Sequence, residues 1–178
     1  MIHLMTVEGG SARKFYLDKE SISDFKALLR TITSGRVMIV STWFRSDLFY
    51  ASDRSLHTEI QKMWVLYTKS NRSEFNEEDL KTISGDENAL CYYFESINKL
   101  ASNWQYFNQY RQVFNRSFIN DRNNPMINTI AQCDRHLVDQ PKINRSGLLD
   151  SNITINKEII SDTFDLAMKI INCDTHAN

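Results

Sequence analysis

The stretch Asn88–Ile119, NALCYYFESINKLASNWQYFNQYRQVFNRSFI, decides the fold that the sequence predicts. Its apolar residues recur every three or four positions, which places them on one face of a helix of about eight turns. The residues of this stripe are Leu90, Tyr93, Ile97, Leu100, Trp104, Phe107, Tyr110, Phe114 and Phe118. At 1.5 Å per residue such a helix is roughly 40 Å long, so other helices must cover it.

Four further amphipathic segments are predicted to supply that cover. They are Ser21–Ile32, Asp53–Lys69, Met126–Val138 and Asn156–Asn172, with a loop over Gln140–Ser151. Ser21 with Asp24 resembles a capping box, and Asn124-Pro125 is typical of an N-cap followed by a first-turn proline. Asn76 precedes three acidic residues, which favour the first turn of another, short helix.

Two segments are ambiguous. Apolar residues on both sides of Gly9-Gly10 allow a short β hairpin within residues 1–17. Val37–Thr42 is rich in β-branched residues and typical of a strand, whereas Trp43 and the residues after it suit a buried helix. Because the neighbouring segments are helical, we predict a helix over residues 37–50. The expected fold class is mainly α: a single-domain bundle of five or more helices spanning residues 1–178.

Composition and charge exclude several classes of protein. The net charge of -1, from 21 basic and 22 acidic residues, gives no global attraction to nucleic acid or an anionic membrane. The longest aliphatic run, Val37–Val40, is too short to cross a bilayer, and no signal peptide precedes it. Cys91, Cys133 and Cys173 form no Cys-x-x-Cys pair, which favours reduced thiols. We therefore expect a cytoplasmic protein without membrane association.

Two Cys-x-x-His pairs, Cys133 with His136 and Cys173 with His176, supply the ligand types of a zinc site. If the last two predicted helices are antiparallel, roughly 25 Å of helix separates the pairs, so we expect no metal. Neither a Gly-x-Ser-x-Gly motif nor a glycine-rich phosphate loop occurs. We expect no cofactor.

Three arginines lie among aromatic residues in the second half of the long predicted helix. They are Arg111, Arg116 and Arg122, near Tyr106, Tyr110 and Phe114. Arginine beside exposed aromatic rings can hold phosphate and stack the bases of single-stranded RNA. Alternatively, the aromatic rings are buried and the arginines form the solvated rim of the helix.

The segment Cys133–Asp139, CDRHLVD, followed by a loop and a terminal amphipathic helix, resembles the C-terminal part of the HEPN superfamily, especially its abortive-infection branch. Members of that superfamily are helical bundles, and many are metal-independent endoribonucleases of toxin–antitoxin and phage-defence systems. Their motif is an arginine, a polar residue and a histidine a few residues later. Asp134 matches the polar position, while Cys133 replaces the arginine and Asp139 replaces the final histidine.

The resemblance implies a HEPN-like bundle that lacks the usual catalytic pair. Such a protein would bind RNA or a protein partner in a phage-defence, toxin–antitoxin or counter-defence setting. The candidate binding residues are Arg135, His136, Asp139, Arg111, Arg116 and Arg122. One alternative is a metal-independent endoribonuclease whose non-standard site uses His136 and Arg135. Another is an unrelated helical interaction module, or a homodimer formed through the aromatic seam.

Overall fold

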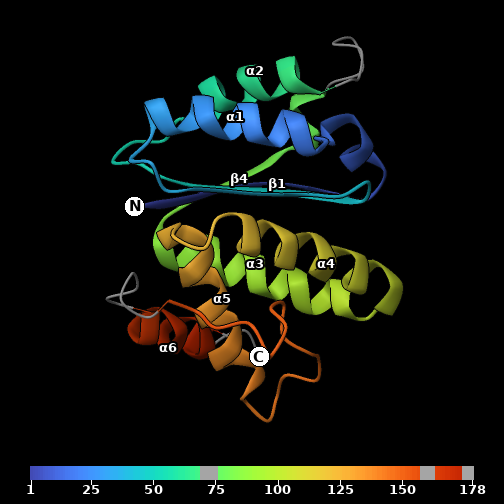
Figure 1. Cartoon of the computed structure of the whole chain (residues 1–178), viewed down its shortest axis with the longest axis vertical. Helices are drawn as coiled ribbons and strands as arrows, with labels where there is room; N and C mark the ends of the chain where they lie inside the picture. The colour runs from blue at the N-terminus through green and yellow to red at the C-terminus, as the bar shows by residue number, and fades with distance from the viewer. Residues whose placement is uncertain (69–75, 157–162, 174–178) are drawn as a thin grey trace. The chain divides into compact units, whose positions relative to one another are not determined.

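The computed structural model describes residues 1–68, 76–156 and 163–173. The chain divides into two compact units, Met1–Gly85 and Asp86–Asn178, and each is described by itself. The N-terminal unit combines helices with a four-stranded antiparallel sheet, whereas the described part of the C-terminal unit is helical (Figure 1). The mainly α fold expected from the sequence is therefore wrong, because the fold is mixed α/β. The single-domain organisation stays a prediction.

The sheet has the strand order β2-β3-β1-β4. Its strands are β1 (Ile2–Glu8), β2 (Val37–Ser41), β3 (Arg45–Ala51) and β4 (Lys81–Ser84). The first strand lies inside the sheet and pairs with β3 along its whole length, from Ile2 opposite Ala51 to Glu8 opposite Arg45. On its other side it pairs with β4, where His3 lies opposite Ser84.

The helix predicted over residues 37–50 is instead the hairpin of β2 and β3. Thr42 closes the turn, because its backbone N–H donates to the carbonyl oxygen of Arg45 at 2.7 Å and its hydroxyl donates to the same oxygen at 2.8 Å. Every residue of both strands is buried. A strand buried on both faces lacks the polar–apolar alternation that marks a strand in sequence, which explains the wrong prediction.

The hairpin expected within residues 1–17 is also wrong. β1 is followed by the 3₁₀ helix η1 (Gly9–Phe15), and the strand finds its partners far along the chain. Gly9 has φ +72°, a conformation that favours glycine, and its N–H donates to the carbonyl oxygen of Phe44 at 2.9 Å. This bond ties the start of η1 to the tip of the β2–β3 hairpin.

Two helices, α1 (Lys19–Ile32) and α2 (His57–Tyr67), cover one face of the sheet (Figure 1). Both were predicted, although Asp18 rather than Ser21 caps α1, by accepting the N–H of Ser21 at 2.9 Å. The core beneath them includes Met5, Val7, Phe15, Phe25, Leu29, Val37, Ile39, Leu48, Ile60 and Trp64. The helix predicted after Asn76 is wrong, since a single 3₁₀ turn, η3 (Glu77–Asp79), leads into β4.

The long helix predicted over Asn88–Ile119 is two helices, α3 (Asp86–Ala101) and α4 (Trp104–Asn120). Asn103 starts α4, because its side chain accepts the N–H of Tyr106 at 3.2 Å. The hydroxyls of Tyr93 and Tyr110 lie 3.0 Å apart in the core. In one continuous helix these residues would be roughly 25 Å apart, so the chain folds back on itself.

The C-terminal unit is completed by α5 (Pro125–Val138) and α6 (Thr163–Cys173). The predicted start of α5 is confirmed: the side chain of Asn124 accepts the N–H of Met126 at 2.9 Å, and proline occupies the first turn. α6 packs against α5 and α3. The helix predicted over Asn156–Asn172 includes residues 157–162, which lie outside the described residues.

Candidate functional site

Two consecutive residues of the HEPN-like segment, Cys133 and Asp134, are fully buried in the C-terminal unit. Burial, and then the charge of Asp134, raises the pKa of the Cys133 thiol to about 12. A thiol with that pKa stays protonated near neutral pH, and the thiolate is the nucleophilic form. Cys133 therefore supplies no nucleophile.

Asp134 forms a buried ion pair with Arg145 in the loop after α5. Arg145 Nη2 lies 2.7 Å from Asp134 Oδ1, and the N–H of Leu148 donates to Oδ2 at 2.6 Å. Burial raises the pKa of Asp134, while the charge of Arg145 opposes that rise. Arg145 Nε also donates to Asn98 Oδ1 at 2.6 Å, and its guanidinium lies 6.0 Å from the centre of the Phe107 ring. Arg145 thereby joins three helices to the loop.

The remaining candidates on α5 have different surroundings. Arg135 Nη2 donates to the carbonyl oxygen of Ile153, so its guanidinium is engaged by the loop. The half-buried His136 has its Nε2 at 3.0 Å from Nε2 of Gln132, one helical turn earlier. Asp139 ends α5 and is exposed. The two residues of the alternative nuclease site, Arg135 and His136, therefore each contact another group of their own unit.

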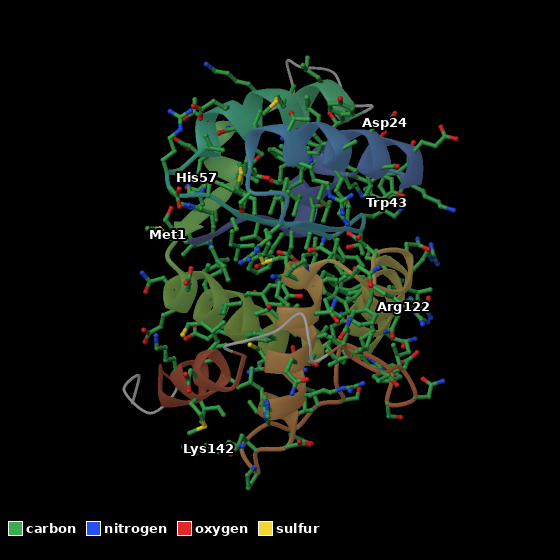
Figure 2. The ribbon with its side chains drawn as sticks, turned by 60° about the vertical axis from the view of Figure 1, so that its left-hand side comes forward. Met1, Asp24, Trp43, His57, Arg122 and Lys142 are labelled. Carbon is green, nitrogen blue, oxygen red and sulfur yellow. The ribbon has the colours of Figure 1, made fainter. Side chains whose placement is uncertain are left out.

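The three candidate arginines have different surroundings, and Arg122 lies at the opposite end of α5 from His136. Arg111 Nη2 lies 2.8 Å from Asp150 Oδ1 in an ion pair. Arg116 and Arg122 are exposed. Arg122, labelled in Figure 2, precedes α5, whereas His136 lies in the last turn of that helix. The helix between them spans roughly 16 Å. Arg122 therefore does not line a groove that faces His136.

Asparagine side chains of α4 and α5 hold the same loop. Asn115 Nδ2 donates to the carbonyl oxygen of Leu148 at 2.8 Å, and Asn115 Oδ1 accepts the N–H of Asp150 at 2.9 Å. Asn128 Oδ1 accepts the N–H of Asn156 at 3.2 Å. The loop has no helix or strand of its own, so these side chains satisfy backbone groups that would otherwise need water. Asn115 and Asn128 therefore stabilise the conformation of the loop.

The sequence did not single out a stacked aromatic pair at the tip of the β2–β3 hairpin. The rings of Tyr16 and Trp43 have centroids 4.0 Å apart and an interplanar angle of 18°, and Trp43 is 60% exposed. Leu17 N–H donates to Ser41 Oγ at 3.0 Å, which fixes the segment of Tyr16 against β2. The sequence prediction placed Trp43 in a buried helix. Only recognising the hairpin would have placed it at an exposed turn.

A second polar cluster joins the ends of β1, β3 and β4. The buried His3 has Nδ1 at 2.9 Å from Ser84 Oγ and Nε2 at 3.3 Å from the carbonyl oxygen of Ser52. Its ring stacks on Tyr50, with centroids 4.7 Å apart, and meets His57 edge-on. Burial, followed by the charge of His3, lowers the pKa of His57. Since a carbonyl only accepts, Nε2 of His3 donates to Ser52; in the neutral imidazole Nδ1 then accepts the Ser84 hydroxyl proton, and in the protonated ring Nδ1 donates to that hydroxyl.

The described residues form neither a metal site nor a membrane-spanning helix. Among them, no three His, Cys, Asp or Glu side chains are grouped so as to hold a metal ion. Cys173 and His176 of the second Cys-x-x-His pair fall where side chains are not described. Within residues 1–68, 76–156 and 163–173, every helix is too short or too polar to span a bilayer.

The chain matches no protein-family model, no curated protein and no solved structure.

Proposed function

We propose that this chain is a non-catalytic protein-binding component with a HEPN-like C-terminal unit, and that it binds its protein partner through Tyr16 and Trp43. The setting proposed from the HEPN resemblance is phage defence, toxin–antitoxin action or counter-defence. The observation that carries the binding proposal is the exposed Trp43 at the hairpin tip, stacked on the half-buried Tyr16. Tryptophan and tyrosine are the residue types most enriched among those that dominate binding energy at protein interfaces.

Contacts within the N-terminal unit hold the pair in place. Bonds from Gly9 to Phe44 and from Leu17 to Ser41 fix both sides of it, and the rings stack on each other. A side chain that is already ordered loses less conformational entropy on association, so more of its contact energy appears as affinity. Trp43 is therefore better suited to anchor a partner than a freely rotating surface residue.

The contacts of the motif residues support a non-catalytic role. Asp134 is paired with Arg145, Arg135 donates to the backbone of the loop, and the Cys133 thiol is buried. A ribonuclease of this family type needs a cationic group at the developing phosphate charge and an imidazole at the 2′-hydroxyl. The only arginine inside the segment, Arg135, is used to hold the loop.

A capture experiment tests the binding proposal. Tagged wild-type, Trp43→Ala and Trp104→Ala chains are each used to retain proteins from cells that express them. Trp104 is the matched control, because it is 64% exposed and lies in the other unit. We expect a protein that wild type and Trp104→Ala retain equally and that Trp43→Ala retains roughly thirtyfold less. Equal retention by all three chains contradicts the proposal, as does loss of a bound RNA instead of a protein.

A second assay addresses catalysis. Purified chain is incubated with labelled RNA and a metal chelator, and the products are resolved by length. We expect intact RNA. Cleavage that disappears in His136→Ala would replace the non-catalytic proposal with the alternative endoribonuclease. Light scattering on the same sample tests the homodimer, which requires twice the mass of one chain.

A further inference from the structure

A polar pocket lies at the end of the N-terminal unit where β1 begins and β3 ends. Its volume is about 690 Å³. The lining residues are Met1, Ile32, Thr33, Ser34, Arg36, Ala51, Ser52, Asp53 and Arg54. Figure 2 shows Met1 and Trp43 on opposite sides of this unit, so the pocket is separate from the aromatic pair. Pockets of this size are typical of small-molecule sites.

Backbone hydrogen bonds hold the walls of the pocket in place. Ser34 N–H donates to the carbonyl oxygen of Ala51 at 3.1 Å, and Ala51 N–H donates to that of Arg36 at 3.0 Å. Ser52 N–H donates to the carbonyl oxygen of Met1 at 3.0 Å. Gly35, with φ +79°, makes the turn that leads Arg36 into β2. These bonds and the Gly35 turn fix the backbone that forms the walls of the pocket.

The charges in the pocket favour an anion. Arg36 and Arg54 are exposed, and neither forms an ion pair with a carboxylate in residues 1–68, 76–156 or 163–173. With Asp53 as the third charged side chain, the side chains of the lining carry a net charge of one positive unit. Guanidinium groups bind phosphate oxygens through paired N–H donors and stay charged at any physiological pH.

The neutral groups narrow the ligand further. The hydroxyls of Thr33 and Ser34 donate to backbone carbonyls, which leaves them as acceptors only. Ser52 Oγ accepts the N–H of Arg54 at 3.3 Å, so its own proton is available to an anion. Met1 and Ile32, 58% and 41% exposed, offer an apolar wall. The carboxylate of Asp53 can accept a ligand hydroxyl. A phosphate, ribose hydroxyls and a flat base whose faces pack on apolar side chains occur together in a nucleotide.

We propose that this pocket binds a mononucleotide, with its phosphate at Arg36 and Arg54, a ribose hydroxyl at Asp53 and the base against Met1 and Ile32. Both arginines contact the phosphate directly. The site and the partner-binding pair at Trp43 are independent, and either can exist without the other.

Calorimetric titration of the full chain with AMP, adenosine, ribose 5-phosphate and inorganic phosphate tests the proposal. We expect AMP to bind most tightly, and Arg36→Gln and Arg54→Gln each to weaken it about tenfold or more. Lys62→Gln removes a positive charge from the exposed side of α2, outside the pocket, and should leave affinity unchanged. Circular dichroism establishes that each variant is folded.

Four results overturn the proposal. They are adenosine binding as tightly as AMP, inorganic phosphate binding as tightly as AMP, no binding of AMP at millimolar concentration, and equal affinity in wild type and both arginine variants. A variant that fails to fold is replaced by Arg36→Lys or Arg54→Lys, which keeps the charge but loses the paired donors, and the same weakening is then expected.

Discussion

The two units each bury an arginine–aspartate pair, but the pairs have opposite roles. In the N-terminal unit Arg45 and Asp47 are two residues apart on β3, and Nε lies 2.6 Å from Oδ2. Forming the strand places both side chains on one face, so the pair follows from the strand. In the C-terminal unit Asp134 and Arg145 come from a helix and an irregular loop. There the ion pair holds the loop in its conformation.

The partners of each arginine sharpen this difference. Arg45 also contacts Glu8, with Nη1 at 3.0 Å from Oε1, and Asp47 also accepts the hydroxyl of Thr6 at 2.6 Å. Among the described residues, Arg145 has one carboxylate partner, Asp134, and its other acceptors are the neutral oxygens of Asn98 and Ser146. Removing the aspartate should therefore leave an uncompensated buried charge only in the C-terminal unit.

Asp134→Ala should have the largest effect. Leaving one member of a buried ion pair without its partner costs about 3–5 kcal/mol. Asp47→Ala should cost less, because Glu8 still compensates Arg45. Hydrogen exchange of the full chain, read separately for each unit, measures both. We expect the amide of Leu148 to lose its protection in Asp134→Ala. The double variant Asp134→Leu/Arg145→Met should recover most of the loss, and equal losses in the two single variants would remove the distinction between the pairs.

Alkaline pH should weaken the C-terminal unit first. The thiol of Cys133 has its pKa raised from 9.0 to about 12, so its contribution is complete below pH 9 and is lost as pH rises through 12. The slope is about 1.4 kcal/mol per pH unit in that window. Burial raises the pKa of Tyr50 in the N-terminal unit too, but a phenol loses its contribution only above its ordinary value of about 10.

The measurement is hydrogen exchange between pH 9 and 10, corrected for the intrinsic exchange rate. Cys133→Ala is the control. Its smaller side chain lowers stability at every pH, but it should flatten the pH dependence of the C-terminal unit. An unchanged slope in this variant would assign the alkaline sensitivity to another group.

Two glycine substitutions contrast backbone strain with crowding. Gly35 has φ +79° and open space around it, so Gly35→Ala should destabilise the N-terminal unit by about 1–2 kcal/mol through backbone strain alone. In Gly147→Ala the new Cβ would lie 3.3 Å from Asp134 Oδ2, and the loop must shift. We expect about 1 kcal/mol there, with loss of protection confined to the loop. Gly10→Ala, which meets no atom within 4 Å and has no positive φ, is the neutral control.

Acid should weaken the N-terminal unit, by the smallest of these effects. The pKa of His57 is lowered by burial and then by His3, so its contribution is complete above the ordinary histidine value of about 6.5 and is lost as pH falls through the folded-state value. His57→Gln should reduce the acid sensitivity of this unit. If exchange from pH 7 to 5 is the same in wild type and variant, the titrating group lies elsewhere.

Local chemistry explains what the sequence could predict. Asn124 and Pro125 determine the start of α5 within three residues, so that start was predictable. The hairpin of β2 and β3 was not, because its strands are buried on both faces and carry no alternation. In the predicted long helix, Trp104 continues the apolar spacing across the break, yet it is 64% exposed. The spacing of apolar residues shows which residues share a helix face, but it does not show where the chain reverses direction.

The contacts of the candidate site residues could not be predicted from the sequence pattern either. The HEPN resemblance implies binding residues at Arg135, His136 and Asp139, whereas the buried Asp134 beside them is held by Arg145 and Leu148. Those partners lie in a loop without periodicity, at separations that no pattern indicates. Tyr16 and Trp43 are 27 positions apart, and only the hydrogen-bonded hairpin brings them together.

The position of β1 in the sheet also bears on synthesis of the chain. His3 pairs with Ser84, 81 residues later, so the first strand cannot gain its second neighbour until the chain beyond Ser84 has left the ribosome. At about 5–20 residues per second that wait lasts several seconds. During it, the strand that will be central is an open edge rich in apolar residues, and such an edge recruits other chains. The N-terminal unit is therefore where we expect nascent chains to depend most on chaperones.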